Sequence, residues 1–327
     1  MQRIVIREFG GPEQLVLEDV ADLQPQSGQV LVDVEAAGVN YLDLNQRSGQ
    51  SRVHTIALPH VLGLEGVGRI RAVGKDVAGI APALKVGARV AWIDVGSSYA
   101  SQAVVPADRA VLIPDTIPVS QGLLFQALTA QYLVHEYRDI QAGDRVLVHA
   151  AASGLGQILV QWLKHRGAWV VGTVSSEAKA AVVRARGADA VAIYGSNYDF
   201  VDQVMAFTDG QGVDLAFDGL GEKTLLNTLS VLRRGGTAVA IGAASGPIPA
   251  VHPTVLTQKA LRLAGGSVFA YVADPAELQQ RARQVIAAIE AGWLRLDEAK
   301  AYPLADATQA HLDIEQRRAL GKLYLVP

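Results

Sequence analysis

Short apolar runs closed by glycine or proline recur through the first 115 residues, a pattern that predicts a β-rich segment. Residues 30–34 and 89–93 are β-branched runs bounded in this way, and residues 1–7 have the pattern of an opening strand. Helical periodicity is sparse in this part of the chain. We therefore expect the N-terminal part to be dominated by strands.

Strand and helix patterns alternate from Gln121 onward. A long apolar helix is predicted at 123–137 and another helix at 275–291, and a last strand is predicted at 322–326. The strands predicted between these helices lie at 145–149, 169–174, 190–193, 213–217, 237–241 and 262–268, with intervening helices at 156–166 and 179–186. Parallel strands need crossover connections, which are usually helices. The alternation therefore predicts an α/β fold with a doubly wound parallel sheet.

Composition bounds the possible functions. The 327 residues, 50% of them hydrophobic, are enough for about two domains that each bury a core. The net charge is −3 and no basic block is present, so we expect no nucleic-acid partner. The least charged stretch, 116–135, contains Pro118, Gly122 and three glutamines, which favours a buried helix over a membrane span.

The chain contains no cysteine. Disulfides, thiolate nucleophiles and sulfur-ligated zinc sites are therefore excluded. This composition fits a cytoplasmic protein, and the N-terminus lacks the apolar run of a signal peptide.

Residues 149–156, HAAASGLG, follow a predicted strand and open a predicted helix. Exposed backbone N–H groups and a helix N-terminus favour a diphosphate at such a turn, and small residues allow it to come close. In the G-x-G-x-x-G pattern the three positions are Ala151, Ser153 and Gly156, so only the third glycine is present. A ligand-free turn is the alternative, but the surrounding strand–helix units favour a dinucleotide site.

The end of the second strand indicates which nicotinamide cofactor is used. Enzymes that use NAD place a carboxylate there to hold the ribose 2′-hydroxyl. This chain has the neutral Ser175 and Ser176, with Lys179 one turn later, which predicts NADPH. Glu177 is the alternative determinant. We interpret it as a first-turn acid, which the helix dipole favours.

Several spaced motifs occur in one order along the whole chain: EFGGPE at 8–13, GVNYLD at 38–43, GLEG at 63–66, LTA at 128–130, the turn at 151–156, GGT at 235–237 and IG at 241–242. The ordered set resembles the medium-chain dehydrogenase/reductase superfamily, specifically its zeta-crystallin-like quinone oxidoreductases.

The resemblance implies a GroES-like catalytic domain made of residues 1–122 and 266–327, with a Rossmann domain at 123–265 and the cofactor in the cleft. It also implies a homodimer that pairs edge strands around 262–268. The NADPH contacts that it implies are Asn40, Thr129, Ser153, Gly154, Leu155, Gly156, Ser175, Lys179, Tyr194, Ile241, Gly242, Val268 and Arg317. Tyr194 and Arg317 would join Lys179 around the 2′-phosphate. Alternatively, Tyr194 caps a strand and Arg317 is a solvated helix residue.

The resemblance also implies that no metal takes part. Zinc-dependent relatives carry a cysteine at the position of Asn40 and a histidine at that of Leu64, and they have a four-cysteine lobe that this chain lacks. His54 and His60 lie in an expected loop, and we interpret them as surface or hydrogen-bonded histidines. We expect zinc-independent chemistry.

For the acceptor we expect Asn40, Asp43, Asn45 and Gln126 to be polar groups facing the pocket. A structural role for Asp43, holding its loop through backbone N–H groups, is equally open. Asn45 and Ser51 stand where relatives commonly have tyrosines, and Gln126 stands where they often have lysine, so the acceptor pocket departs from the family.

The function implied is hydride transfer from NADPH to a quinone, whose hydroquinone anion takes protons from solvent. Positioning matters more than acid catalysis in such a reaction. The alternatives are an NADPH-dependent reductase of activated alkenes, for which the missing tyrosine is unfavourable, and a non-catalytic NADPH-binding protein of the crystallin kind.

Overall fold

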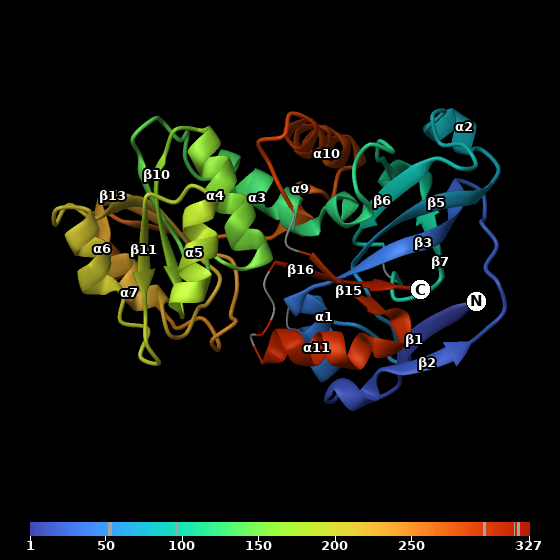
Figure 1. Ribbon diagram of the computed structural model, residues 1–327, viewed down its shortest axis with the longest axis horizontal. Helices are drawn as coiled ribbons and strands as arrows, with labels where there is room; N and C mark the ends of the chain where they lie inside the picture. The colour runs from blue at the N-terminus through green and yellow to red at the C-terminus, as the bar shows by residue number, and fades with distance from the viewer. Residues whose placement is uncertain (52–53, 96, 297–298, 317, 319–320) are drawn as a thin grey trace. The chain divides into compact units, whose positions relative to one another are not determined.

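The computed structural model describes residues 1–51, 54–95, 97–296, 299–316, 318 and 321–327. The chain divides into two compact units (Figure 1). Unit 1 comprises Met1–Phe125, Val272–Glu290 and Leu296–Pro327, and unit 2 comprises Gln126–Tyr271 and Ala291–Arg295. Within the described ranges, no helix is long and apolar enough to cross a membrane.

Unit 1 contains a larger sheet of order β15-β16-β3-β5-β6-β8, with β7 also paired to β3, and a smaller sheet of order β2-β1-β4. Its strands are β1 (Gln2–Ile6), β2 (Val16–Asp19), β3 (Gln29–Val39), β4 (His60–Val61), β5 (Glu65–Val73), β6 (Arg89–Ile93), β7 (Gln102–Pro106), β8 (Val111–Leu112), β15 (Ala299–Pro303) and β16 (Lys322–Val326). Its helices are α1 (Tyr41–Ser48), α2 (Val77–Ile80), α10 (Pro275–Glu290) and α11 (Ala307–Glu315).

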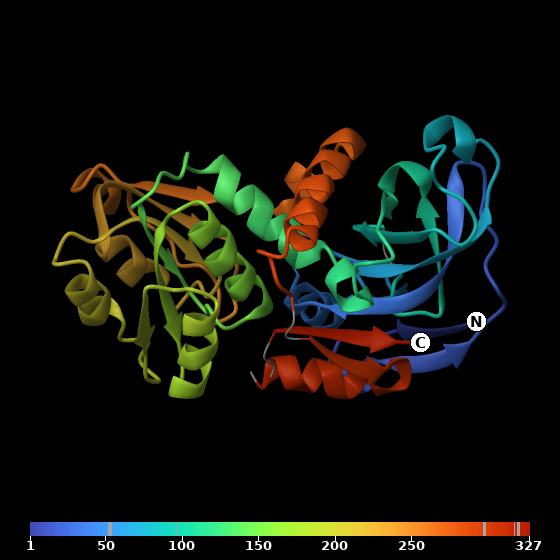
Figure 2. The same ribbon diagram turned by 45° about the horizontal axis from the view of Figure 1, so that its top comes forward.

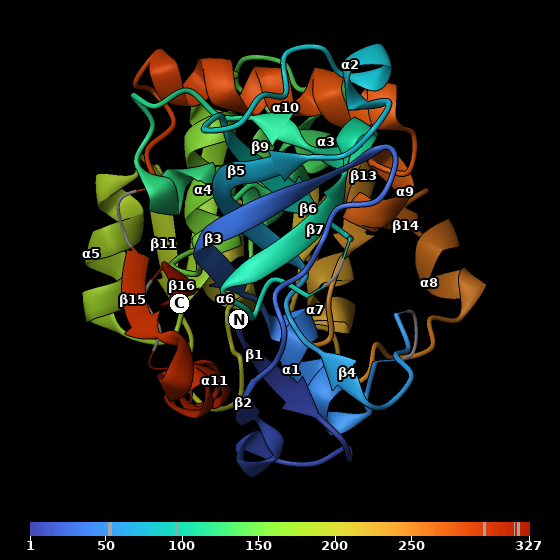
Figure 3. The ribbon, with the colours of Figure 1, turned by 90° about the vertical axis from the view of Figure 1, so that its right-hand side faces the viewer.

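The long strand β3 organises unit 1, because β5, β7 and β16 all pair with it in antiparallel register (Figure 3). The core beneath these strands includes the fully buried side chains of Trp92, Tyr99 and Ile4. Helix α11 packs along β15 and β16 (Figure 2). The C-terminal strand is therefore a part of the same core as the N-terminal strands.

Unit 2 is a parallel sheet of order β11-β10-β9-β12-β13-β14, with α4 and α5 on one face and α6 and α7 on the other (Figure 1). This is the strand order 3-2-1-4-5-6 of a dinucleotide-binding fold, whose order reverses between β9 and β12. Its strands are β9 (Arg145–Val148), β10 (Trp169–Val174), β11 (Ala190–Ile193), β12 (Val213–Asp218), β13 (Leu232–Ala240) and β14 (Arg262–Gly265). Its helices are α3 (Phe125–Glu136, from Gln126 on), α4 (Gly154–His165), α5 (Glu177–Ala185), α6 (Val201–Phe207), α7 (Leu225–Ser230), α8 (Pro253–Thr257) and α9 (Val268–Tyr271).

The predicted fold class is confirmed, and the strands predicted at 89–93, 169–174, 190–193 and 322–326 have the observed bounds. The strand predicted at 262–268 is wrong in its second half, because β14 ends at Gly265 and Val268 opens α9. The hydroxyl of Tyr137 donates to the Gly265 carbonyl at 2.8 Å, and a Cβ on Gly266 would lie 2.1 Å from that hydroxyl. The Tyr137 hydroxyl thus lies against the chain where β14 ends.

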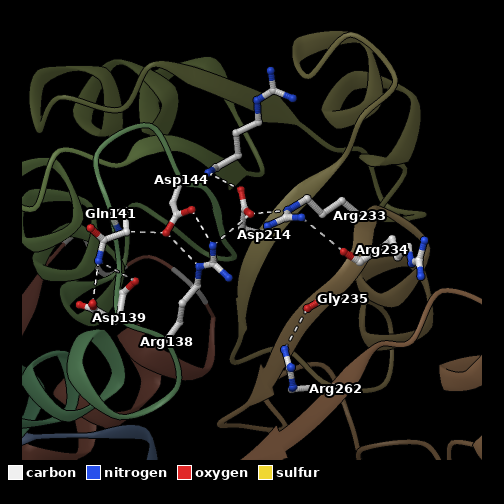
Figure 4. A network of polar contacts seen from close by, with 10 residues as sticks. Arg138, Asp139, Gln141, Asp144, Asp214, Arg233, Arg234, Gly235 and Arg262 are labelled. Atoms are coloured by element: carbon white, nitrogen blue, oxygen red, sulfur yellow. Dashed lines mark hydrogen bonds and ion pairs between the residues drawn. The ribbon is translucent and has the colours of Figure 1, made fainter.

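An ionic network joins the strand starts of unit 2 at the amino edge of the sheet (Figure 4). Asp214, at the start of β12, accepts hydrogen bonds from the backbone N–H of Arg145 at 2.8 Å and from the guanidinium groups of Arg138 and Arg233. Asp144 accepts a pair of hydrogen bonds from the same Arg138 guanidinium. These contacts stabilise the edge opposite the carboxyl ends of the strands, where ligands of such sheets bind.

Candidate cofactor and catalytic site

The turn between β9 and α4 has the geometry of a phosphate cradle. Ser153 is the N-cap of α4, and its hydroxyl accepts a hydrogen bond from the Gly156 N–H at 3.1 Å. A Cβ on Gly156 would lie 2.5 Å from the carbonyl oxygen of Ala150 and 2.7 Å from Cα of Ala151. The third glycine is therefore required for the turn, whereas serine at the second position serves as a cap. The N–H groups of Gly154 and Leu155 at the helix start suit a diphosphate.

Gln126 lies against this turn. A Cβ on Gly154, the first residue of α4, would be 2.2 Å from the Gln126 Oε1 atom. Thr129, one turn later on α3, is half-buried. The sequence grouped Gln126 with Asn40, Asp43 and Asn45, but the structure places it in unit 2 beside the phosphate turn and the other three in unit 1.

The end of β10 carries the residues expected near a 2′-phosphate. Ser175 is exposed, and the Lys179 ammonium donates to its hydroxyl at 3.3 Å. Ser176 is the N-cap of α5. The Glu177 carboxylate forms an ion pair with Arg184 on the surface of α5. This pairing supports the interpretation of Glu177 as a helix-surface acid.

Tyr194 and Arg317 are the other two residues that were expected near the 2′-phosphate. Tyr194 directly follows β11 and is buried, with its ring stacked on that of Tyr198 at a centroid distance of 4.8 Å. Its backbone N–H donates to the Val174 carbonyl at 3.0 Å, so it does extend the strand pairing. Arg317 lies outside the described residues.

The loop after β12 is held to the start of α7 by Asp218, which the sequence did not indicate. This fully buried carboxylate accepts hydrogen bonds from the N–H groups of Leu220 at 2.9 Å and Gly221 at 3.0 Å. It also accepts from the hydroxyls of Thr224 at 2.8 Å and Thr228 at 2.9 Å. The sequence signal that could have indicated Asp218 is its place directly after the strand predicted at 213–217.

Three expected cofactor residues follow β13. The Ile241 N–H donates to the Asp218 carbonyl at 2.9 Å, and a Cβ on Gly242 would lie 2.6 Å from the Gly219 carbonyl oxygen. Val268 is buried at the start of α9. Ile241 and Gly242 thus sit directly against the loop that Asp218 organises, beside the reversal point of the sheet.

Unit 1 contributes a buried polar cluster at the start of α1. Asn40 is the N-cap residue, and its N–H donates to Asp43 Oδ2 at 2.7 Å. Burial raises the pKa of Asp43 to about 7, although the hydrogen bond from Asn40 and the charge of Lys322 act to lower it. Asp43 is fully buried, so the structure supports its role in holding the loop.

Glu65 and Lys322 complete this cluster and were missed as site residues. Glu65 Oε1 accepts from Asn40 Nδ2 at 2.9 Å and is ion-paired with Lys322, while Oε2 accepts from the Phe125 N–H at 2.8 Å. The sequence signals were the acid within the GLEG motif and a lysine at the head of an apolar last strand. Neither signal shows that the two residues meet.

The remaining expected residues are placed as follows. Asn45 is half-buried on α1, and its carbonyl accepts from the Ser51 N–H at 3.1 Å. Leu64 is buried. His60 lies in β4 rather than in a loop, and burial lowers its pKa. Among the described residues, no three histidine, aspartate or glutamate side chains are grouped so as to hold a metal ion.

The stability of the fold should report the titration of Asp43. The pKa of Asp43 is about 7 in the folded chain, against 3.8 for an ordinary aspartate in water, so the folded protein binds this proton more tightly. Its contribution to stability is full below about pH 4 and is lost as the pH rises to about 7. We expect Asp43→Asn to gain roughly 3 kcal/mol relative to the wild type between pH 4.5 and 7, at ~1.4 kcal/mol per pKa unit.

Urea unfolding of both proteins across this pH range measures the difference. The comparison with the variant is needed because burial also lowers the pKa of His149, and lowers that of His311 to about 3. These histidines destabilise the fold as the pH falls, with the opposite sign. Parallel stability curves for variant and wild type would show that Asp43 does not titrate in this range.

A GroES-like unit joined to a doubly wound sheet with a phosphate cradle defines a dinucleotide-binding oxidoreductase of the medium-chain type. Residues 26–115 match the family model described as alcohol dehydrogenase GroES-like domain, and residues 154–289 match that described as zinc-binding dehydrogenase.

Full-length relatives identify the family. The chain is 33% identical over 330 residues to a quinone oxidoreductase of Pseudomonas aeruginosa, covering 100% of this chain and 99% of the relative. It is 34% identical over 332 residues to a 2-haloacrylate reductase of a Burkholderia species, covering 99% and 98%. The solved structure of Escherichia coli quinone oxidoreductase complexed with NADPH has a TM-score of 0.93 and 31% identity, covering 100% of both chains. The chain belongs to the quinone oxidoreductase family of the medium-chain dehydrogenase/reductase superfamily, which confirms the resemblance found in the sequence.

Proposed function

We propose that this chain is an NADPH-dependent quinone oxidoreductase that works without a metal. One observation carries the cofactor choice: Ser175 directly follows β10 and its hydroxyl accepts a hydrogen bond from the Lys179 ammonium, while the nearby Glu177 is ion-paired with Arg184. The Escherichia coli quinone oxidoreductase, whose solved structure is a complex with NADPH, supports the proposal through its similarity over the whole chain.

The residues of unit 2 would hold the cofactor. Ser153 to Gly156 would form the diphosphate cradle, with the backbone N–H groups of Gly154 and Leu155 as donors, because the Ser153 and Gly156 N–H groups donate within the turn. Gly156 lets the helix start pack closely on the backbone of Ala150 and Ala151. Lys179, with Tyr194 and Arg317, would bind the 2′-phosphate through charge-assisted hydrogen bonds. The remaining contacts with the cofactor would come from Thr129, Ile241, Gly242 and Val268. When bound, NADPH supplies the hydride.

Unit 1 would supply polar groups for the reaction, with Asn40 and Asn45 as the acceptor-side residues. A quinone that receives the hydride becomes a hydroquinone monoanion, and one proton from solvent completes the hydroquinone. The chain then needs to orient the reactants and exclude water rather than donate a proton.

An acceptor panel tests the function. NADPH oxidation should be fast with 9,10-phenanthrenequinone, slow with 2-alkenals, and slower throughout with NADH. Tight NADPH binding without turnover of any acceptor would instead identify a non-catalytic NADPH-binding protein.

Reduction of activated alkenes is the second candidate, because the Burkholderia relative is a 2-haloacrylate reductase. Including 2-haloacrylate in the panel separates the two. A kcat/KM for that acid above the value for the quinone would favour the alkene reductase.

Cofactor preference should depend on Lys179. We expect the wild type to prefer NADPH over NADH by on the order of 10- to 1,000-fold in kcat/KM, and Lys179→Ala to remove roughly tenfold of this preference. The loss should lie in KM for NADPH, because the phosphate is remote from the hydride and adds binding shared by ground and transition states.

Two control variants accompany this measurement. Lys85→Ala removes an exposed lysine of unit 1, and Glu177→Gln removes the acid on α5. Both should leave the NADPH to NADH ratio within about twofold of the wild type. If Glu177→Gln changed the ratio and Lys179→Ala did not, the assignment of the 2′-phosphate site would be wrong.

We also propose that the chain is a cytoplasmic homodimer that pairs copies of β14 across a two-fold axis. In the described part of the chain, β14 pairs with β13 alone, at the end of its sheet. An uncovered strand edge invites association, and a two-fold pairing covers it. Light scattering at micromolar concentration should give twice the chain mass of 34.6 kDa.

A further inference from the structure

Lys322 is a buried cation at the head of the last strand of unit 1. Its side chain is 9% exposed, and that of its ion-pair partner Glu65 is 0% exposed. The register of β16 on β3, in which Leu323 lies opposite Val39, brings Lys322 beside Asn40. A Cβ on Gly38 would lie 2.3 Å from Glu65 Oε1, so this glycine leaves room for the carboxylate. The fold thus builds a closed site for one ion pair.

This ion pair distinguishes the two ends of the Asn40 amide. The Lys322 ammonium donates to Asn40 Oδ1 at 2.7 Å, and Asn40 Nδ2 donates to Glu65 Oε1 at 2.9 Å. A reversed amide would turn its N–H groups toward the ammonium and its oxygen toward the carboxylate. Because both contacts would then be repulsive in a buried site, the charges select a single orientation.

We propose that Lys322 and Glu65 are positioning residues that hold Asn40 as a fixed hydrogen-bond donor, whose second Nδ2 hydrogen binds an oxygen of the substrate or the cofactor. Within the described part of the chain, no hydrogen bond takes that hydrogen, whereas Oδ1 and the first N–H are engaged. Asn40 therefore presents an oriented N–H donor to a ligand. The ligand in this inference rests on the proposed function.

A fixed donor suits hydride transfer to a quinone. The hydride brings two electrons, and the carbonyl oxygen of the acceptor takes up the negative charge until solvent supplies a proton. A donor that is oriented before the reaction stabilises such an oxygen without reorganisation. The carboxamide oxygen of the nicotinamide is the other acceptor of matching chemistry.

An exchange of amide and carboxylate between positions 40 and 65 tests the proposal. Asn40→Asp alone places two carboxylates against each other, and Glu65→Gln alone removes the counter-charge of Lys322. We expect each to lower the urea unfolding midpoint and to lower kcat/KM by at least about 100-fold. Asn227→Asp, the same change at an exposed position, should alter neither quantity.

The double variant Asn40→Asp/Glu65→Gln separates orientation from donation. Its glutamine can donate to the new carboxylate and still accept from the Phe125 N–H, and Lys322 keeps an anionic partner. We expect the urea midpoint to return to near the wild-type value, because the charges and hydrogen bonds are complementary again. We expect kcat/KM to stay at least about 100-fold low, because a carboxylate at position 40 cannot donate.

The urea midpoint and the kcat/KM of the double variant test different parts of the proposal. An unrecovered midpoint in the double variant would overturn the orientation, and a recovered kcat/KM would overturn the donor role. The Kd of the double variant for NADPH, measured by fluorescence titration, shows which oxygen Asn40 binds. A tenfold weakening identifies the carboxamide oxygen of the nicotinamide, and an unchanged Kd identifies the carbonyl oxygen of the acceptor. The midpoint recovery tests the orientation whether or not quinones are substrates, so failure of the proposed function would leave that result standing.

Discussion

Gly156→Ala should lower the affinity for NADPH by at least about 100-fold and the stability of the fold by about 3 kcal/mol. The new Cβ would meet the carbonyl oxygen of Ala150 at 2.5 Å and Cα of Ala151 at 2.7 Å. Both are backbone atoms, so the turn itself must move, and the N–H groups that would bind the diphosphate move with it. Fluorescence titration with NADPH and urea unfolding measure the two effects.

Gly79→Ala is the matched control. Gly79 lies in the short helix α2 of unit 1, has an ordinary φ, and has no neighbouring atom within 4 Å of the added Cβ. Alanine is preferred to glycine in a helix, so this variant should be as stable as the wild type or slightly more so. Unchanged NADPH affinity in Gly156→Ala would show that the turn does not hold the diphosphate.

Asp218→Ala should destabilise the chain by about 3–5 kcal/mol and weaken NADPH binding at least about tenfold. The substitution removes the acceptor of four hydrogen bonds and leaves the N–H groups of Leu220 and Gly221 buried without partners, at ~1–3 kcal/mol each. The loop from Gly219 to Gly221, on which Gly242 packs, then loses its anchor.

Asp214→Ala, at the other end of β12, is the control for this experiment. Asp214 also accepts several hydrogen bonds, but Arg233 and Arg138 are 46% and 26% exposed and can be resolvated by water (Figure 4). We expect a smaller loss of stability and an unchanged Kd for NADPH. A similar loss of NADPH affinity in both variants would indicate a general loosening of unit 2 rather than a role of Asp218 at the cofactor edge.

The doubly wound sheet could be predicted because its determinants are local. Buried parallel strands such as 169–174 and 190–193 are continuous apolar runs. In the helices between such strands, apolar residues recur every three to four positions. The phosphate turn was predictable for the same reason, since Ser153 and Gly156 act on each other within a single helical turn.

Several helices were not predicted from the sequence, and α1 and α9 illustrate two different reasons. Helix α1 has a capping box of Asn40 and Asp43 at its start and is followed by the C-cap Gly49 with a φ of 74°, so its signals lie in its caps and not in apolar periodicity. Helix α9 follows the end of β14, where the hydroxyl of the distant Tyr137 donates to the Gly265 carbonyl. No local pattern contains that information.

The sequence by itself determined the class of fold, the position of the phosphate turn and the neutral end of β10, because these depend on residues within one or two turns of each other. The tertiary structure alone decided the partners of Gln126 and Asp218 and the meeting of Asn40, Glu65 and Lys322. Lys322 is 282 positions from Asn40 and 257 positions from Glu65 in the sequence, and the register of β16 on β3 brings the three side chains into contact. A lysine at the head of an apolar strand can be solvated or can be buried in an ion pair. It is buried only where the packing excludes water and supplies a carboxylate.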